Sequence, residues 1–354
     1  MLELADVAQY LQARGALSRQ SIVDFGLVVS DVSSRHRNFR VEIPGAGGLQ
    51  LKQALARDMQ PAVLREAILY RQLQESDPRF AGLMPEFRDY DADRGILILA
   101  LVPDAEDLRV HHLRAKRCRP DVGGAIGEAL AMLHSRSAPE GAVTSCPLPP
   151  FAGLFEPSVE VFRNASAANL DLLRIIRGAD ELTSAFDSLR AQLRCESLLH
   201  NDLKWDNLLL TPQGMRLVDW ESAEYGDPAW DLGSMFGQYL SLWLFSVPLT
   251  GSAPVANFAA LASFPLGDIK LAINACWTGY FTERQIPAAA TSELLRRAIS
   301  MTAMRLLQTA FESSQFAPQL TSCDILHVQL ASNIVQRPVE ACRQLLGLPL
   351  RADA

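Results

Sequence analysis

Residues 198–231 read LLHNDLKWDNLLLTPQGMRLVDWESAEYGDPAWD, and this stretch decides the fold. An apolar pair leads into an H-x-D motif that ends on Asp202, and Asn207 follows five residues later. Threonine, proline and glycine at residues 211–214 predict a hairpin turn between two apolar runs. The second run ends on Asp219, so we expect the hairpin to bring Asn207 and Asp219 together.

The side chains of Asp202, Asn207 and Asp219 are the kinds of group that an enzyme needs to transfer a phosphoryl group from one oxygen to another. That reaction requires an acceptor for the hydroxyl proton and hard oxygen ligands for Mg²⁺. Asp202 would orient and deprotonate the acceptor hydroxyl, while the Asn207 carbonyl and the Asp219 carboxylate would hold the metal. An isolated Asp near an Asn is usually a turn or a helix cap, so the prediction depends on the joint occurrence of these motifs.

The chain contains the motifs HNDLKWDN, VDWE and GDPAWDLG, which follow one another in this order. In these motifs it resembles the phosphotransferase family that contains aminoglycoside and choline kinases, and this family is similar to protein kinases. The resemblance implies an α+β, bilobal protein-kinase-like fold. Residues 1–103 would form a small N-terminal lobe with an antiparallel sheet and one main helix. Residues 104–354 would form a larger, mostly helical C-terminal lobe with the catalytic loop, the metal site and a helical substrate-binding region. In this family, His200 would support that loop and Asp231 would brace it from the next helix.

The pattern of hydrophobic residues agrees with this architecture. Three strands, one helix and two more strands differ from an alternating βαβ order and build a small sheet with one packed helix. Strands are expected at residues 25–32, 39–43, 49–54, 87–90 and 96–102, with helices near residues 4–15 and at 61–73. Helical spacing recurs at residues 123–134, 168–176, 184–194, 271–281, 291–311 and 322–336.

The resemblance to this family also includes one lysine and one glutamate in the N-terminal part of the chain. Lys52 in LQLKQA matches the family's sheet lysine, and Glu66 in LREAILYRQL matches the glutamate of the neighbouring helix. These two would pair, with the ammonium of Lys52 on the nucleotide phosphates. The glycine-rich turn at residues 44–48 could be a phosphate-binding loop, but such a loop has its lysine at the start of a helix. Lys52 lies inside a strand, so we interpret the turn as a β-hairpin. ATP and Mg²⁺ are the implied cofactors.

The remaining nucleotide contacts are also implied by the resemblance. The nucleotide-covering loop falls on residues 33–39, which are not rich in glycine, with Ser34 and Asn38 as candidate contacts. Adenine is expected against backbone groups of the linker strand, at Leu99 and Leu101.

Lys204 bears on the phosphate acceptor. It departs from the aminoglycoside-kinase pattern and resembles serine/threonine protein kinases, in which a lysine at this place neutralises the transferred phosphoryl group. An alcohol acceptor is therefore favoured, although a surface lysine beside Asp206 is the simpler interpretation.

Residues 232–282 add a second indication, because they contain a single acid, Asp268, and suit a polycationic antibiotic poorly. Aromatic residues in this segment favour a less charged or peptide acceptor. They are Tyr239, Trp243, Phe245 and Phe258.

The chain contains the segments KWDN, WESAEYGDPAWDLG and YLSLWLFSVPL. In these segments it also resembles the kinases that work with lyases in class V lanthipeptide and thioamitide biosynthesis. This resemblance implies a kinase for Ser/Thr of a ribosomal precursor peptide (RiPP biosynthesis) that works with a separate lyase. The alternatives are a small-molecule antibiotic or metabolite kinase of the aminoglycoside or macrolide type, a choline-type kinase, and a non-catalytic nucleotide-binding pseudokinase.

Composition excludes several other classes. The 354 residues contain 33 basic and 40 acidic residues, and the net charge of -7 opposes non-specific nucleic-acid binding. The basic run HHLRAKRCR at residues 111–119 is interpreted as a solvated helix face rather than an anion-binding surface. Six scattered cysteines and the lack of a secretory signal indicate a cytoplasmic protein. Residues 232–267 carry no charge, but polar residues and proline interrupt them, so we expect a buried helix and no membrane partner.

Overall fold

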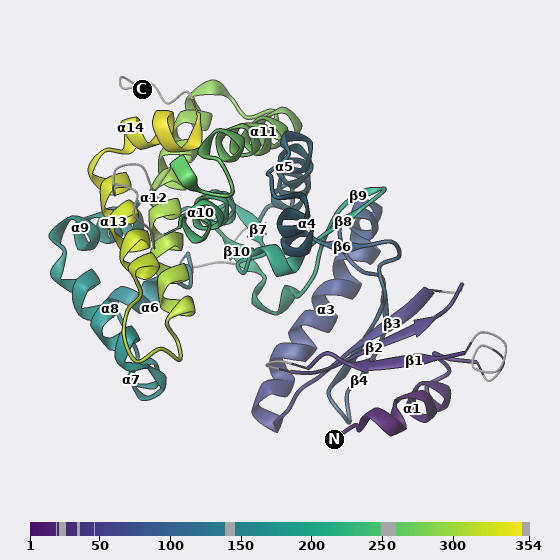
Figure 1. The fold of residues 1–354 in the computed structure, drawn as a ribbon. Helices are drawn as coiled ribbons and strands as arrows, with labels where there is room; N and C mark the ends of the chain where they lie inside the picture. The colour runs from purple at the N-terminus through teal and green to yellow at the C-terminus, as the bar shows by residue number, and fades with distance from the viewer. Residues whose placement is uncertain are drawn as a thin grey trace. The chain divides into compact units, whose positions relative to one another are not determined.

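A computed structural model of the chain describes residues 1–18, 20, 26–33, 36–45, 47–138, 146–248 and 260–348. Two compact units form (Figure 1): the N-unit, residues 1–108 with 207–223, and the C-unit, residues 109–206 with 224–354. The hairpin with the predicted metal ligands therefore belongs to the N-unit, whereas the sequence analysis had assigned it to the C-terminal lobe. The lobe boundary after residue 103 stays a prediction.

The N-unit contains the predicted five-stranded antiparallel sheet, in the order β1-β2-β3-β5-β4. Three strands, one helix and two strands follow each other along the chain as expected, which confirms the α+β assignment of this part. The elements are α1 (Val7–Ala13), β1 (Val28–Asp31), β2 (Arg37–Ile43), β3 (Gly47–Gln53), α3 (Gln60–Ser76), β4 (Phe87–Asp91) and β5 (Ile96–Ala100).

The alternation of side chains along β3 gives this sheet two different faces. Leu49 and Leu51 are buried in an apolar cluster that also contains Val7 and Leu11 of α1. Lys52 points to the other face, where it meets α3. A single strand thus supplies both the core under α1 and the polar centre beside α3.

The glycine-rich turn connects β2 to β3 as a hairpin, with Ile43 opposite Gly47. Gly47 has a φ of +88°, which only glycine adopts without strain. A Cβ atom on Gly48 would lie 2.2 Å from the carbonyl oxygen of Val41. Residue 46 lies outside the described residues, but the register on either side of it confirms a hairpin rather than a phosphate loop.

A second hairpin in the N-unit carries the predicted metal ligands. It consists of β8 (Leu208–Thr211) and β9 (Gly214–Leu217), and β6 (Glu106–Asp107) extends it to three strands. The Val218 N–H donates to the backbone carbonyl oxygen of Asn207 at 3.0 Å, just beyond the paired strands. Asn207 and Asp219 therefore lie at the same end of the hairpin, as the sequence predicted.

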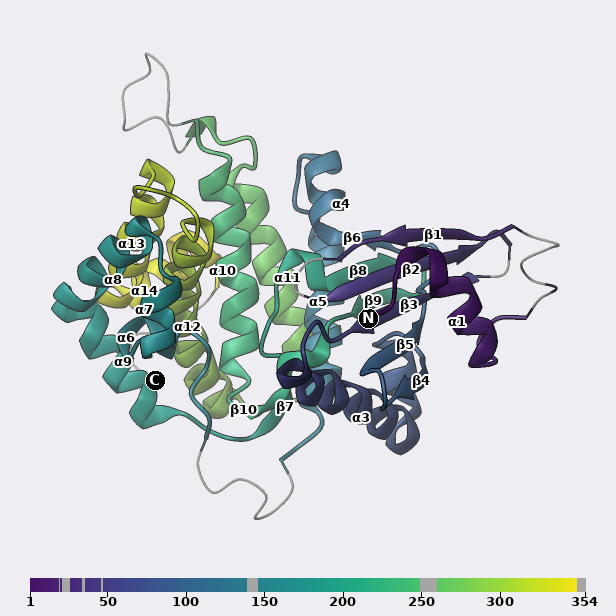
Figure 2. The same ribbon diagram turned by 90° about the horizontal axis from the view of Figure 1, so that it is seen from below.

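The C-unit is mostly helical, and each helix predicted for it is present with ends shifted by a few residues. α10 lies beside α12 (Figure 1, Figure 2). The long helices are α5 (Pro120–His134), α8 (Ala167–Gly178), α9 (Asp180–Gln192), α10 (Ala229–Phe245), α11 (Leu266–Arg284), α12 (Ala288–Ser313) and α13 (Ser322–Gln336). Shorter elements are α4 (Leu108–Ala115), α6 (Ala152–Phe155), α7 (Val159–Asn164), α14 (Pro338–Ala341), β7 (Ser197–Leu199) and β10 (Glu224–Gly226).

The basic run at residues 111–119 corrects one prediction, since it is not simply a solvated helix face. His112 is 1% exposed and packs edge-on against Trp205, with ring centroids 4.8 Å apart. Burial lowers the pKa of His112 to about 4. His111 in α4 and Cys118 after it are buried as well. The basic members remain exposed: Arg114, Lys116, Arg117 and Arg119.

The first part of the uncharged segment, up to Phe245 in α10, is a buried helix, as predicted. In the described part of the chain, none of the helices combines the length and the apolar run that a bilayer crossing requires. A second correction concerns its aromatic residues, because Tyr239 is 0% and Trp243 8% exposed. Both pack in the helical core and are not available to an acceptor. Phe245 is exposed, and Phe258 lies outside the described residues.

Two glycines of α5 allow its backbone to pack directly against the backbone of α11 in the C-unit. A Cβ atom on Gly127 would lie 2.0 Å from the carbonyl oxygen of Cys276, and one on Gly123 would lie 2.3 Å from that of Ala272. A Cβ atom on Gly124, in the same helix, would meet nothing within 4 Å. Small residues are therefore required on only one side of α5.

Gly127→Ala is expected to lower the free energy of unfolding by about 2 kcal/mol, because its methyl group would overlap the α11 backbone. Gly124→Ala is the matched control and is expected to stabilise the helix by roughly 0.5–1 kcal/mol. Urea unfolding followed by circular dichroism measures both variants. Equal stability of the two would contradict the close packing of α5 on α11.

Candidate functional site

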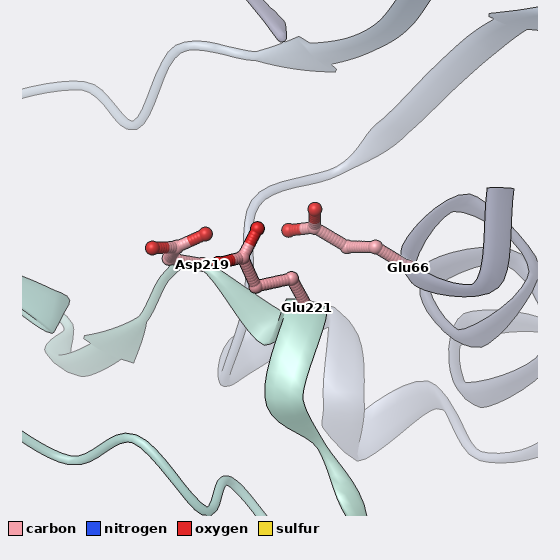
Figure 3. A group of neighbouring side chains, drawn as sticks. All are labelled: Glu66, Asp219 and Glu221. Atoms are coloured by element: carbon pink, nitrogen blue, oxygen red, sulfur yellow. The ribbon is translucent and has the colours of Figure 1, made fainter. Parts of the chain in front are cut away.

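The ammonium of Lys52 lies among three carboxylates in the N-unit. Its Nζ is 2.5 Å from Asp219 Oδ1, 2.8 Å from Glu66 Oε2 and 2.9 Å from Glu221 Oε2. Figure 3 shows the three carboxylates pointing toward one another, one from α3 and two from the segment after β9. The Lys52–Glu66 pair expected from the sequence is present. Glu221 is an additional member that the sequence analysis did not identify.

Backbone geometry after β9 sets the positions of these groups. Asp219 has a φ of +65° and a ψ of +65°, a left-handed conformation that turns the chain into the short 3₁₀ helix Trp220–Ser222. The N–H of Trp220 donates to Glu66 Oε1 at 3.0 Å. Glu66 thus uses one oxygen for this backbone group and the other for Lys52, which joins α3, β3 and the post-hairpin segment.

The charges in this cluster shift the pKa values of its members. Burial would lower the pKa of Lys52, but the surrounding carboxylates of Glu66, Asp219 and Glu221 reverse this and raise it above its usual value. A hydrogen bond from His36, followed by the charge of Lys52, holds the pKa of Glu221 well below its ordinary range. Burial raises the pKa of Glu66, and Lys52 acts in the opposite direction.

His36 is a second residue that the sequence analysis missed. Its Nε2 lies 2.7 Å from Glu221 Oε2, and its side chain is 6% exposed. The only local signal was its place in the predicted nucleotide-covering loop. The contact joins residues 185 positions apart, so no pattern along the chain could reveal it.

The donor set of this cluster fits a divalent metal. One oxygen each of Glu66, Asp219 and Glu221 can be chosen so that all lie within 4.8 Å of one another. Three carboxylates around one ammonium leave an excess of negative charge, and carboxylate oxygens are the ligands that Mg²⁺ prefers. Asp219 is the most exposed of the three at 36%, whereas Glu66 is 1% exposed and engaged on both oxygens. Asp219 and Glu221 are therefore the better candidates to hold a metal, and Glu66 is the better partner of Lys52.

The predicted nucleotide-covering loop closes on Asn38. The Asn38 N–H donates to Ser33 Oγ at 3.0 Å, and the Val32 N–H donates to the Asn38 carbonyl oxygen at 2.9 Å. Asn38 lies directly opposite Lys52 in the β2–β3 register, so the two side chains share a face of the sheet. Ser34, the other candidate contact in this loop, lies outside the described residues.

The two candidate adenine contacts lie at the end of β5. Leu99 is 7% exposed and is paired with Gln50 on one side and Phe87 on the other. The N–H of Leu101 donates to the Gly48 carbonyl oxygen at 2.9 Å. Their contact with adenine stays a prediction.

In the C-unit, Asp231 holds the backbone of the H-x-D motif. Its Oδ2 accepts from the His200 N–H at 2.8 Å and its Oδ1 accepts from the Asn201 N–H at 3.0 Å. Asp231 is fully buried at the start of α10, and His134 Nε2 lies 3.2 Å from it. Asn201 has a φ of +67°, so this carboxylate stabilises a turn that is unfavourable for a non-glycine residue. The bracing expected of Asp231 is present.

Asp202 follows this braced turn and is paired with Lys204. Lys204 Nζ donates to Asp202 Oδ2 at 2.7 Å, and the side chains are 36% and 26% exposed, respectively. A carboxylate and an ammonium in contact and open to solvent can receive a hydroxyl proton and stabilise an added negative charge. Their assignment to catalysis stays a prediction.

A separate cavity of about 680 Å³ in the N-unit contains none of the predicted site residues. It is lined by α1, by Gln53 and by residues after β3, and it includes both acids and arginines. Gln53 belongs to the β3 positions on the α1 side, opposite to Lys52. Its position on the other face of the sheet distinguishes this cavity from the Lys52 cluster.

Comparison with known proteins covers the predicted site residues of both units. The sequence model of the phosphotransferase enzyme family matches residues 28–264, which includes each predicted site residue. A comparison with curated proteins finds none that matches.

Solved structures of three kinases resemble the fold over nearly the whole chain. A choline/ethanolamine kinase family protein from Mesorhizobium loti is 17% identical with a TM-score of 0.51, covering 96% of this chain and 95% of that one. A choline kinase from Cryptosporidium parvum is 11% identical with a TM-score of 0.58, covering 95% and 96%. A macrolide 2′-phosphotransferase from Brachybacterium faecium is 17% identical with a TM-score of 0.50, covering 93% and 98%.

At these identities the structures establish the fold, and the family match covers more than half of the chain. The protein-kinase-like fold predicted from the HNDLKWDN and VDWE motifs is confirmed. The chain therefore belongs to the phosphotransferase enzyme family and is a kinase of that family.

Proposed function

We propose that this kinase transfers the γ-phosphoryl group of ATP, with Mg²⁺, to an alcohol hydroxyl, and that the acceptor is a Ser/Thr side chain of a precursor peptide. The observation that carries the proposal is the cluster of Lys52 with Glu66, Asp219 and Glu221. It combines a fixed cation for phosphate oxygens with an excess of carboxylates for a metal.

Mg²⁺ would be held by Asp219 and Glu221, with Asn207 at the same end of the hairpin as a third oxygen donor. When bound, the metal would neutralise charge on the nucleotide phosphates. Lys52, kept in place by Glu66, would contact the phosphates themselves. Asn38 lies opposite Lys52 on the same face of the sheet, which supports a contact with the nucleotide.

Asp202 would orient the acceptor hydroxyl and take its proton. The two hydrogen bonds from His200 and Asn201 to Asp231 support this role, because they fix the turn that presents Asp202. The presence of Lys52, Asp202, Asn207 and Asp219 together supports catalysis over a non-catalytic pseudokinase.

The peptide acceptor is supported by the position of Lys204. Its contact with Asp202 places an ammonium beside the proposed base, where it would neutralise the transferred phosphoryl group. Together with the resemblance of KWDN and WESAEYGDPAWDLG to kinases of class V lanthipeptide and thioamitide biosynthesis, this favours a peptide hydroxyl. A separate lyase would then act on the phosphorylated residue.

A small-molecule hydroxyl is the second candidate, since the similar structures are choline-type kinases and a macrolide 2′-phosphotransferase. A choline site would require an open aromatic cage around the quaternary ammonium. Trp205 and Tyr239 of the C-unit contact each other edge-on at 4.8 Å and both are buried, so this pair does not form such a cage.

Asp202→Asn is expected to reduce kcat by about 10²–10⁴-fold, because the amide cannot accept the hydroxyl proton. Affinity for Mg²⁺–ATP is expected to stay within about twofold of wild type, since Asp202 is not among the proposed ligands. Asp206→Asn makes the same chemical change four residues later and is the control. Wild-type turnover by Asp202→Asn, measured by ATP consumption with acceptor, would remove Asp202 from the mechanism.

Asp219→Ala is expected to weaken Mg²⁺-dependent ATP binding by at least about tenfold, because it removes a proposed metal ligand. Isothermal titration calorimetry with a non-hydrolysable ATP analogue, with and without Mg²⁺, measures the effect. Metal-free binding should change less. If the Mg²⁺-dependent gain in affinity is the same in the variant and in wild type, Asp219 does not hold the metal.

The acceptor is tested by offering the protein its co-encoded peptides, choline, a macrolide and an aminoglycoside in parallel with ATP. Mass spectrometry is expected to show phosphate on a peptide Ser/Thr. Lys204→Ala should lower kcat on that acceptor while leaving the KM for ATP unchanged. Phosphate on the small molecules alone would overturn the peptide proposal and leave the kinase assignment intact.

A further inference from the structure

His36 connects the predicted nucleotide-covering loop to the proposed metal carboxylates. It is the residue directly before β2, and its ring reaches Glu221, in the segment after β9. Among the described residues of the loop, His36 is thus joined to that segment through its side chain. The side chain is 6% exposed, so solvent contributes little to holding the ring.

The contact controls the orientation of one carboxylate. His36 Nε2 and Lys52 Nζ approach the same oxygen of Glu221, Oε2, at 2.7 and 2.9 Å. Because the carboxylate accepts from Nε2, this ring nitrogen carries the proton. Two donors from different elements on one oxygen fix the rotation of the Glu221 carboxylate, which a single donor would not do.

The same residue lies close to the part of the loop that faces Lys52. The carbonyl oxygen of His36 accepts from Asn38 Nδ2 at 3.4 Å, and Asn38 lies opposite Lys52. Ser33 closes the turn on Asn38 from the other side. His36 therefore contacts the loop through its backbone carbonyl and Glu221 through its ring.

The His36 contact also compensates the negative charge of Glu221, because Lys52 alone cannot neutralise three carboxylates. Lys52 is shared by three carboxylates, so each receives only part of its attraction. Glu221 is 13% exposed and would lose a hydrogen bond that water replaces poorly at that depth. Partners of metal ligands typically change metal affinity by about 10–100-fold when they are removed.

We propose that His36 is a positioning residue of phosphoryl transfer, which couples the nucleotide-covering loop to Glu221 so that loop position and metal affinity change together. This inference rests on the proposed Mg²⁺–ATP function of the cluster. His36 itself touches neither substrate nor metal in this assignment.

Three variants of the full chain test the proposal. His36→Phe keeps the ring and removes the donor, and His36→Gln keeps a donor at a similar distance from the backbone. His327→Phe is the matched control, because His327 is also buried, in the C-unit, and takes no part in the cluster. Calorimetry measures binding of a non-hydrolysable ATP analogue over a range of Mg²⁺ concentrations, and thermal unfolding measures stability.

His36→Phe is expected to weaken Mg²⁺-dependent nucleotide binding by about tenfold, with His36→Gln within about threefold of wild type. His327→Phe should alter the melting temperature without altering the Mg²⁺ dependence. Unchanged Mg²⁺-dependent binding in His36→Phe, or equal loss in His36→Phe and His36→Gln, would overturn the positioning role. If wild type itself showed no Mg²⁺-dependent nucleotide binding, the proposed function would fail as well, so the two failures are distinguishable.

Discussion

The rest of the N-unit site depends on one buried ammonium shared by three carboxylates. Lys52 draws together β3, α3 and the segment after β9, and Glu66 completes the link by accepting from the Trp220 N–H. Bringing three acids together is unfavourable unless a cation compensates them. One ammonium compensates them only in part. The excess of negative charge left at Asp219 and Glu221 is the physical reason for assigning a divalent metal to this end of the hairpin.

A different device fixes the H-x-D motif in the C-unit. Asp231 accepts from two consecutive backbone N–H groups and so stabilises a left-handed Asn201. The arrangement uses a buried charge for geometry, and it leaves the neighbouring Asp202 and Lys204 partly exposed. In both centres a fully buried acid fixes the backbone, and the more exposed groups are the ones to which we assign the chemistry.

The sequence predicted those features that are encoded locally. Strand alternation around Lys52, the hairpin between Asn207 and Asp219, and the helical spacing of α13 each depend on neighbouring residues, and the structure agrees with them. The missed features depend on contacts between distant residues. His36 meets Glu221 across 185 positions, and the burial of Tyr239 and His112 follows from helix packing that hydrophobic spacing alone does not reveal. Glu221 had a local signal, since it follows Asp219 by two residues in VDWE, but its role becomes clear only beside Lys52.

The most direct measurement is a crystal structure of the protein with Mn²⁺ in place of Mg²⁺ and a non-hydrolysable ATP analogue, with the metal located by its anomalous signal. We expect the metal on the carboxylates of Asp219 and Glu221, and Lys52 Nζ on phosphate oxygens while it keeps its contact with Glu66. Nucleotide and metal bound in the cavity beside α1, or a metal that contacts neither Asp219 nor Glu221, would contradict it.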